Sequence, residues 1–180
     1  MGRESASLIV LLIILTVNLS SAIEVQSVEA SGTIYIRADG SIDPPDAPIS
    51  TIDNVTYTLT GTISSTAGGI IVERDDVVID WTGFTVEGAG TDHGIFCNGR
   101  HNVTLQDSNI NGFYRGISLS SSSDCSIIEN NVTNNGNYGV WLAYARANFK
   151  VLVLACTRIK LHPFSLSFSN YLTLFLSLTL

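Results

Sequence analysis

The chain of 180 residues carries 16 acidic side chains against nine lysines and arginines, which gives a formal net charge of −7. This acidic balance argues against nucleic-acid binding, because phosphate recognition needs clustered cations. The length suits one domain with a sizeable hydrophobic core.

Residues 1–22 have the pattern of a secretory signal peptide. Arg3 supplies a charged start, residues 8–17 form an apolar run, and residues 20–22 provide a small-residue cleavage site. The apolar run is shorter than the roughly 20 residues of a membrane-spanning helix, which disfavours the alternative of an uncleaved anchor. We therefore expect a secreted protein, either extracellular or on the cell surface.

Residues 23–53 are expected to form an irregular lead-in or N-terminal cap. This segment contains Pro44, Pro45 and Pro48, and prolines at this density favour turns. Residues 54–65 then alternate apolar and polar side chains, as a strand does. They are predicted to form either the first coil of the repeat or the cap that covers its open end.

From residue 69 to about residue 142 the sequence repeats. The pairs Gly94-Ile95, Gly116-Ile117 and Gly139-Val140 recur at intervals of 22 and 23 residues. A period in the low twenties, with short apolar strands and Asn/Gly turns, is typical of a solenoid of strands. The sequence therefore predicts an all-β fold, a parallel β-helix of about four coils of 22–26 residues over residues 54–145.

Superposing the repeats predicts columns of inward-facing apolar side chains, because alternate residues of a strand face the same side. Cys97 and Cys125 fall in these columns, where they act as small hydrophobes rather than as catalytic thiols or a disulfide pair. The columns are Ile70/Ile95/Ile117/Val140, Val72/Cys97/Leu119/Leu142, Val77/Val103/Cys125, Ile79/Leu105/Ile127 and Phe84/Ile110/Val132.

A turn column of Gly83, Asn109 and Asn131 is predicted to be structural. Gly and Asn tolerate the left-handed backbone conformation, and stacked Asn side chains can bond to one another. Asn54, Asn102 and Asn131 each begin the sequence Asn-Val-Thr, which matches the N-glycosylation motif. Because the ladder competes for Asn131, the glycosylation candidates are Asn54 and Asn102.

Residues 146–180 form an atypical apolar tail. No glycine follows Gly139 and no acidic residue follows Glu129, so the repeat is expected to stop after Tyr144 with its last coil incomplete. The abrupt change favours a frameshift product or a broken gene. The alternative is a membrane segment over residues 164–180, which lacks charge but is short and rich in Ser and Thr for a spanning helix. Only in that case do we expect membrane attachment.

The repeat resembles that of the right-handed parallel β-helix proteins. The pattern Gly-Ile-x-Leu, an Asn-rich turn, then Asn-x-Ile/Val and Asn134-Asn135-Gly136 is similar to the pectate-lyase-like superfamily. Within it, the resemblance is to NosD-type proteins and to carbohydrate-binding and sugar-hydrolysis repeat modules, and it covers residues 54–144. It implies a right-handed, single-stranded β-helix. Such coils serve lyases, hydrolases, epimerases, adhesins and copper-delivery proteins alike, so function must be argued from the site.

The outward-facing residues offer one acidic pair. Asp107 and Glu129 stand on successive coils, two positions before the Asn marker, and so about 5 Å apart. That spacing suits Ca²⁺ or the carboxylate pair of a retaining glycosidase; the alternative is two solvated acids. Trp81 occupies the equivalent position in the preceding coil, where it would stack on a sugar ring or cover the coil below.

A second outward column, formed by His93, Arg115 and Tyr138, precedes each Gly-Ile pair. An arginine with a neighbouring histidine and tyrosine suits recognition of a sugar carboxylate. The alternative is that these are ordinary surface turn residues.

The leading functional hypothesis is a noncatalytic secreted module that binds an extracellular polysaccharide or a surface protein. No complete catalytic signature is present, and this hypothesis implies no cofactor, although calcium would suit the acidic pair. The first alternative is a fragment of a carbohydrate-active enzyme, a lyase or glycosidase. The second is a NosD-type periplasmic copper-handling protein, although copper prefers His, Met or Cys ligands and only His93 and His101 of the histidines fall in the coils.

Overall fold

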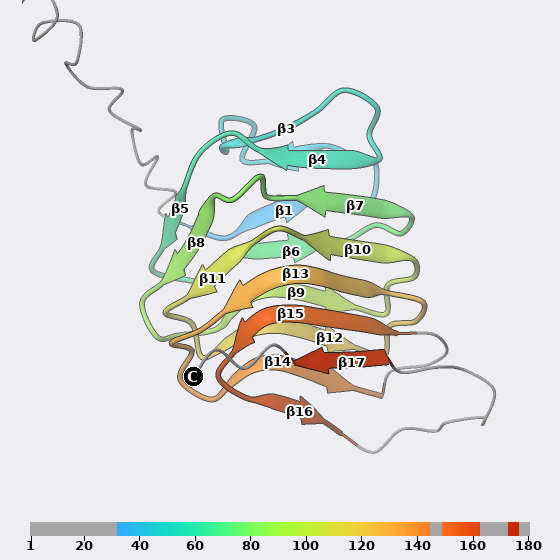
Figure 1. The fold of residues 1–180 in the computed structure, drawn as a ribbon. Coiled ribbons are helices and arrows are strands. Elements are labelled where there is room, and N and C mark those ends of the chain that lie inside the picture. The colour runs from blue at the N-terminus through green and yellow to red at the C-terminus, as the bar shows by residue number, and fades with distance from the viewer. Residues whose placement is uncertain (1–31, 145–148, 163–172, 177–180) are drawn as a thin grey trace, which may run out of the picture.

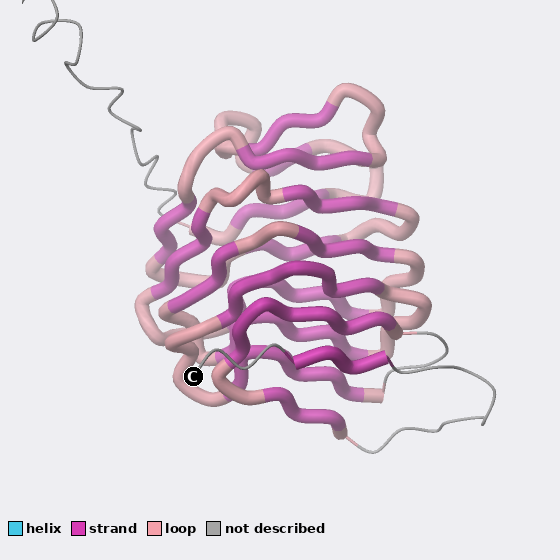
Figure 2. The backbone as a smooth tube through the Cα atoms, viewed as in Figure 1, coloured by secondary structure: helices cyan, strands magenta, loops and turns pink. Residues whose placement is uncertain are grey.

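The computed structural model describes residues 32–144, residues 149–162 and the backbone of residues 173–176. Every regular element in these ranges is a strand (Figure 2). None of the described residues forms a helix long and apolar enough to cross a membrane. The predicted signal peptide (1–22) lies outside the described residues, and so does most of the predicted membrane segment (164–180). The strands are β1 (Ile34–Ile36), β2 (Ile42–Asp43), β3 (Ile49–Thr51), β4 (Thr56–Leu59), β5 (Ile63–Ser65), β6 (Ile70–Val72), β7 (Val77–Asp80), β8 (Thr85–Gly88), β9 (His93–Asn98), β10 (Val103–Gln106), β11 (Asn109–Asn111), β12 (Arg115–Ser120), β13 (Ser126–Val132), β14 (Tyr138–Ala143), β15 (Lys150–Cys156), β16 (Ile159–Leu161) and β17 (Thr173–Leu176).

The strands stack as a parallel β-solenoid with two sheets (Figure 1). The first sheet has the strand order β16-β14-β12-β9-β6-β1-β2. The second has the order β3-β4-β7-β10-β13-β11-β8-β5, with β15 paired to β13 and β17 paired to β15. One coil runs through β9, β10 and β11, and β12 then pairs in parallel with β9 to begin the next. The predicted parallel β-helix is confirmed.

The hydrophobic core lies between the sheets and follows the predicted columns. Ile95 pairs with Ile70 on one side and Ile117 on the other, and Ile117 pairs with Val140. The side chains of these four residues are completely buried. Burying an aliphatic side chain of this size contributes about 1.5–3 kcal/mol to the free energy of folding. The stacked columns are therefore the main stabilising element of the coils.

Antiparallel strands close the N-terminal end of the solenoid. β2 runs antiparallel to β1, and β3 runs antiparallel to β4. Arg37 joins β1 and β2 to the turn after β6, because its guanidinium pairs with Asp43, lies 3.2 Å from Glu73 Oε1 and lies 4.0 Å from the ring centroid of Tyr35. The cap therefore comes from the predicted lead-in, whereas residues 54–65 supply β4 and β5 of the first coil.

The stacking continues past Tyr144, where the sequence had led us to expect it to stop. β15 pairs in parallel with β13, and β16 pairs in parallel with β14. Phe149, Val151 and Val153 are buried in the core. These side chains keep the inward alternation although the Gly and Asn turn markers are gone. Residues 145–148, 163–172 and 177–180 lie outside the described residues.

Candidate binding face

The outer face of the first sheet carries a group of aromatic and polar side chains that we call the arginine–aromatic patch: His93, Phe96, Arg115, Ser118 and Trp141. Arg115 in β12 lies opposite His93 in β9 and Tyr138 in β14. Ser118 lies opposite Phe96 and Trp141 in the same strands. The structure thus brings together the predicted column of His93, Arg115 and Tyr138, and it adds two aromatic rings that the sequence analysis had not singled out.

Arg115 is the centre of the patch. Its guanidinium carbon lies 3.7 Å from the ring centroid of Trp141 and 5.6 Å from that of Tyr114. Its Nη1 lies 3.3 Å from His93 Nε2. Among the described residues, no carboxylate forms an ion pair with it. A guanidinium held against an indole ring makes a cation–π contact that leaves its donor atoms without a carboxylate partner.

His93 has both ring nitrogens engaged. Its Nδ1 lies 2.7 Å from Asp92 Oδ1, and the backbone N–H of His93 donates to the same oxygen at 2.9 Å. Its ring stacks on Phe96 with the centroids 5.0 Å apart. This geometry suits an imidazole that carries its proton on Nδ1 and accepts a hydrogen bond from Arg115 on Nε2. Asp92 therefore orients His93, and His93 in turn positions Arg115.

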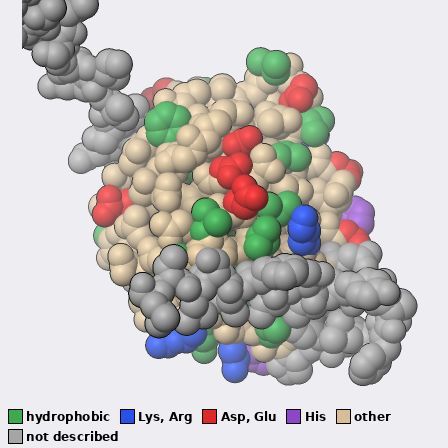
Figure 3. Space-filling view, viewed as in Figure 1, with side chains coloured by type: hydrophobic (Ala, Val, Ile, Leu, Met, Phe, Trp, Pro, Cys, Tyr) green, Lys and Arg blue, Asp and Glu red, His purple; other side chains and the backbone are tan. Residues whose placement is uncertain are grey.

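The acidic pair lies on the second sheet, far around the coil from Arg115. Asp107 and Glu129 are exposed and line one cleft of about 480 Å³. Figure 3 shows acidic side chains gathered on this face. Asp80 also lines the cleft and accepts a hydrogen bond from Gln106 Nε2 at 3.0 Å. The cleft has no basic side chain in its lining, which comprises Asp80, Thr82, Gly83, Asp107, Ser108, Asn109, Glu129, Asn131 and Leu154.

Trp81 corrects one sequence-based expectation, because it is completely buried and cannot stack on a sugar. It continues the inward alternation of Val77 and Ile79. The turn that follows it is two residues longer than in later coils. As a result Asn109 pairs with Thr85 rather than with Gly83, and Val86 rather than Phe84 stands opposite Ile110.

The predicted Asn column forms a chain of hydrogen bonds. Asn131 Nδ2 donates to Asn109 Oδ1 at 3.2 Å, and Asn109 Nδ2 donates to the Gly83 carbonyl at 2.9 Å. The asparagines that are buried, however, are Asn130 and Asn135. Asn130 accepts from Ser108 and Asn135 accepts from the Phe113 backbone N–H, so both tie successive coils together from the inside. The sequence analysis had named Asn135 only as part of the Asn134-Asn135-Gly136 motif and had not named Asn130.

The two glycosylation candidates lie on the surface at left-handed backbone positions. Asn54 has φ 55° and Asn102 has φ 52°. Asn102 Nδ2 donates to Asp76 Oδ1 at 2.9 Å, and the side chain stays exposed. Glycosylation at these two residues stays a prediction.

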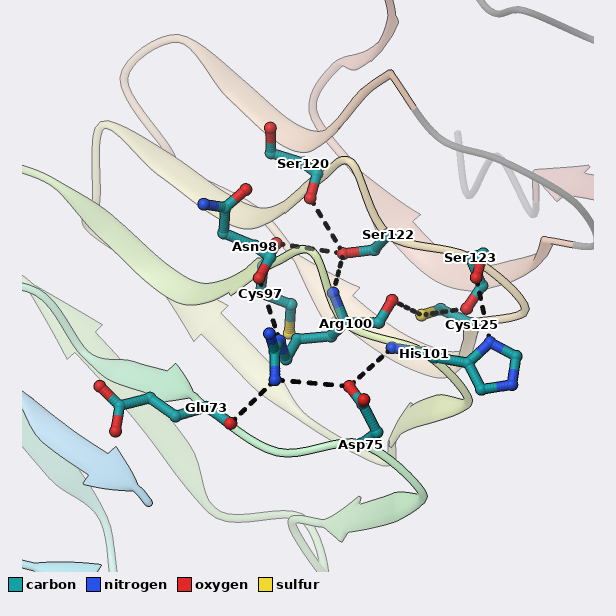
Figure 4. Close-up of polar contacts among 10 residues, drawn as sticks. All are labelled: Glu73, Asp75, Cys97, Asn98, Arg100, His101, Ser120, Ser122, Ser123 and Cys125. Carbon is teal, nitrogen blue, oxygen red and sulfur yellow. Dashed lines mark hydrogen bonds and ion pairs between the residues drawn. The ribbon is translucent and has the colours of Figure 1, made fainter. Parts of the chain in front are cut away.

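A third polar group lies where the first sheet turns into the second (Figure 4). Arg100 Nη1 donates to the Glu73 carbonyl at 2.9 Å and lies 3.5 Å from Asp75 Oδ1. His101 Nδ1 lies 3.0 Å from Ser123 Oγ and 3.2 Å from Asp124 Oδ2. These contacts join neighbouring coils, so the group has a structural role. Throughout the described parts of the chain, no three His, Cys, Asp or Glu side chains gather in a way that would hold a metal ion.

The three cysteines in the described residues are free thiols. Burial raises the pKa of the Cys97 thiol above its ordinary range, and it raises the pKa of Cys125 to about 11. Burial also raises the pKa of Cys156. The thiolate is the nucleophile and the metal ligand, so these thiols are inert at neutral pH.

One comparison with known proteins gives a match. A family model described as "Periplasmic copper-binding protein (NosD)" matches residues 16–152, which is well over half of the chain. No curated protein and no solved structure gives a significant match.

Proposed function

We infer the function of this chain from the premise that it belongs to the NosD family of periplasmic copper-binding proteins. We propose that it is a noncatalytic β-helix module outside the cytoplasm and that it binds a saccharide on the arginine–aromatic patch. The observation that carries this proposal is the guanidinium of Arg115, held 3.7 Å from the ring centroid of Trp141 with no carboxylate paired to it among the described residues.

The chemistry of the patch suits sugar rings. Saccharides present apolar C–H faces together with many hydroxyl oxygens. Aromatic rings such as Phe96 and Trp141 provide flat contact area at low entropic cost, and an arginine provides several donors in a fixed geometry. The parallel strands of three successive coils hold the backbones that carry these groups in a fixed register, so the two aromatic rings are in place before a ligand binds.

The noncatalytic assignment is supported by the distribution of charge. Acid–base catalysis on a glycan requires carboxylates placed with suitable partners around one substrate site. Asp107 and Glu129 lie in a cleft whose lining contains no basic side chain. The arginine–aromatic patch, on the other sheet, contains no carboxylate of its own.

The first experiment measures saccharide binding by isothermal titration calorimetry on a panel of plant and bacterial oligosaccharides. We expect wild-type protein to bind at least one of them and Trp141→Ala to weaken that binding about 10-fold or more, because a central aromatic anchor is lost. Tyr35→Ala is the matched control: Tyr35 also lies under an arginine, Arg37, but that arginine is neutralised by Asp43 and Glu73. Equal affinity of Trp141→Ala and wild type would contradict the proposal.

Copper handling is the second candidate, favoured by the family description. The described donor set does not fit a copper site. His93 Nε2 lies against the Arg115 guanidinium, and Cys97 is completely buried with a raised pKa. His101 belongs to no group of three or more His, Cys, Asp or Glu side chains that could hold a metal ion in the parts of the chain that the structure describes.

Copper binding can be tested directly at neutral pH. Equilibrium dialysis against Cu(II), and against Cu(I) under reducing conditions, should leave less than one equivalent bound per chain at pH 7, since the thiols remain protonated well below the pKa of about 11 at Cys125. One equivalent retained by wild type and lost in His93→Gln or His101→Gln would instead establish a copper site.

A further inference from the structure

Two buried polar atoms of β12 have no hydrogen-bond partner within the described parts of the chain: Ser118 Oγ and Arg115 Nε. Ser118 is completely buried although it lies on the outer face of the sheet, between Phe96 and Trp141 in register. Leaving buried polar groups unpaired is costly, and in native proteins such groups call for an explanation. Here both belong to the arginine–aromatic patch.

The surrounding charge is positive, in contrast with the acidic chain as a whole. Lys160 in β16 lies opposite Trp141 and is exposed. Arg158 is exposed and donates to the Asn137 carbonyl at 3.2 Å, next to Tyr138. The nearest acid along the chain, Asp92, is already engaged by His93. An anionic group would therefore meet Arg115, Arg158 and Lys160 at this patch, with Asp92 as the acid beside His93.

Resting on the proposed function, we propose that the ligand is a carboxylated saccharide whose carboxylate binds at Arg115 and Ser118. The carboxylate accepts hydrogen bonds from the guanidinium edge that includes Arg115 Nε, and from the hydroxyl of Ser118. The sugar ring lies against Phe96 and Trp141. Arginine donors in a planar fork match a planar carboxylate, and a charge-assisted bond of this kind is about twice as strong as one between neutral groups.

Ser118 is completely buried, so in this proposal the Arg115 side chain moves when the carboxylate binds. The guanidinium now lies against Trp141 and His93, with no ion pair to a carboxylate among the described residues to hold it. A charge-assisted hydrogen bond to the carboxylate replaces the cation–π contact with Trp141. Ligand binding therefore shifts Arg115 from the indole to the carboxylate and exposes the serine hydroxyl.

The experiment compares trigalacturonate with its methyl ester by titration calorimetry, because esterification removes the charge and keeps the ring. We expect the ester to bind about 10-fold or more weakly.

Arg115→Lys keeps the charge but loses the planar fork, and should weaken trigalacturonate binding to a similar degree. Ser118→Ala should weaken it about 10-fold or more, because it removes one hydrogen bond to a charged acceptor. Lys150→Gln, which removes one exposed positive charge from the second sheet, is the matched control and should leave affinity unchanged.

Thermal unfolding of the same variants separates a binding role from a structural one. Ser118→Ala removes an unpaired buried hydroxyl, so its Tm should equal or exceed that of wild type. A lower Tm with unchanged affinity would overturn the assignment of Ser118. Equal affinity for the acid and its ester would overturn the carboxylate inference and leave saccharide binding intact. Absence of binding to every saccharide would overturn both proposals.

Discussion

Replacing Asn130 with alanine should lower the free energy of unfolding by about 3 kcal/mol or more, as measured by urea titration. Asn130 is completely buried, and its side chain makes four hydrogen bonds. Oδ1 accepts from the backbone N–H and the hydroxyl of Ser108, at 3.1 and 2.5 Å. Nδ2 donates to the carbonyls of Leu105 and Ile128, both at 2.9 Å. Truncation leaves these groups buried and unpaired.

The neighbouring residue supplies the control. Asn131 is half-buried, and its amide makes one side-chain hydrogen bond, to Asn109. Asn131→Ala should therefore cost about 1 kcal/mol or less. Equal destabilisation by the two substitutions would show that the internal hydrogen bonds of Asn130 are not what joins the coils.

Adding one methyl group at Gly116 should lower the free energy of unfolding by about 3 kcal/mol, again measured by urea titration. A Cβ atom built there lies 2.3 Å from Val132 Cγ1 and 2.7 Å from the carbonyl oxygen of Gly139 in the next coil. The Val132 methyl can shift slightly, but the carbonyl belongs to the backbone of β14. Gly116→Ala therefore forces two coils apart.

Gly136→Ala is the matched control for this prediction. A Cβ at Gly136 meets no atom closer than 3.7 Å, and the residue is exposed. Its effect should stay within about 0.5 kcal/mol. If both alanine variants unfolded at the wild-type urea concentration, the close approach between coils would not be what requires glycine at Gly116.

The same close approach explains why the repeat could be found in the sequence. A Cβ at Gly69 would lie 2.2 Å from the carbonyl of Gly94, and one at Gly94 would lie 2.7 Å from the carbonyl of Gly116. Each coil therefore demands glycine at one position, and the spacing of these glycines gave the period. The inward columns followed from strand alternation, so most of the fold was predictable.

Residues with a left-handed backbone conformation explain why strand alternation did not predict every buried side chain. Glu129 has φ 57°, and the register of β13 against β15 shifts beside it. The chain thus changes phase by one residue: Ile127 faces inward, but Asn130 rather than Asn131 is the next buried side chain. Asp107, with φ 56°, has the same effect before Ser108. Because Asn130 and Asn131 are both asparagines, the sequence did not indicate which of the two side chains was internal.

The candidate site was predictable only in part. The period placed His93, Arg115 and Tyr138 in one column, and the structure agrees. The contact between Trp141 and Arg115 requires the arginine side chain to extend along its strand and across to the next coil. The spacing of residues in the sequence does not predict that conformation. The buried, unpaired hydroxyl of Ser118 was not predictable either, since a serine on an outer face is ordinarily solvated.

The antiparallel cap also bears on how such a chain can evolve. Each coil contacts only its neighbours, so duplication of one unit of about 22 residues adds a coil without disturbing β2 and β3. A unit inserted between β6 and β9 would lengthen the molecule and leave the arginine–aromatic patch whole. One inserted between β9 and β12 would separate His93 from Arg115 by a full coil. Selection on ligand binding would therefore keep the number of coils constant within the arginine–aromatic patch, whereas the number of coils outside the patch could vary.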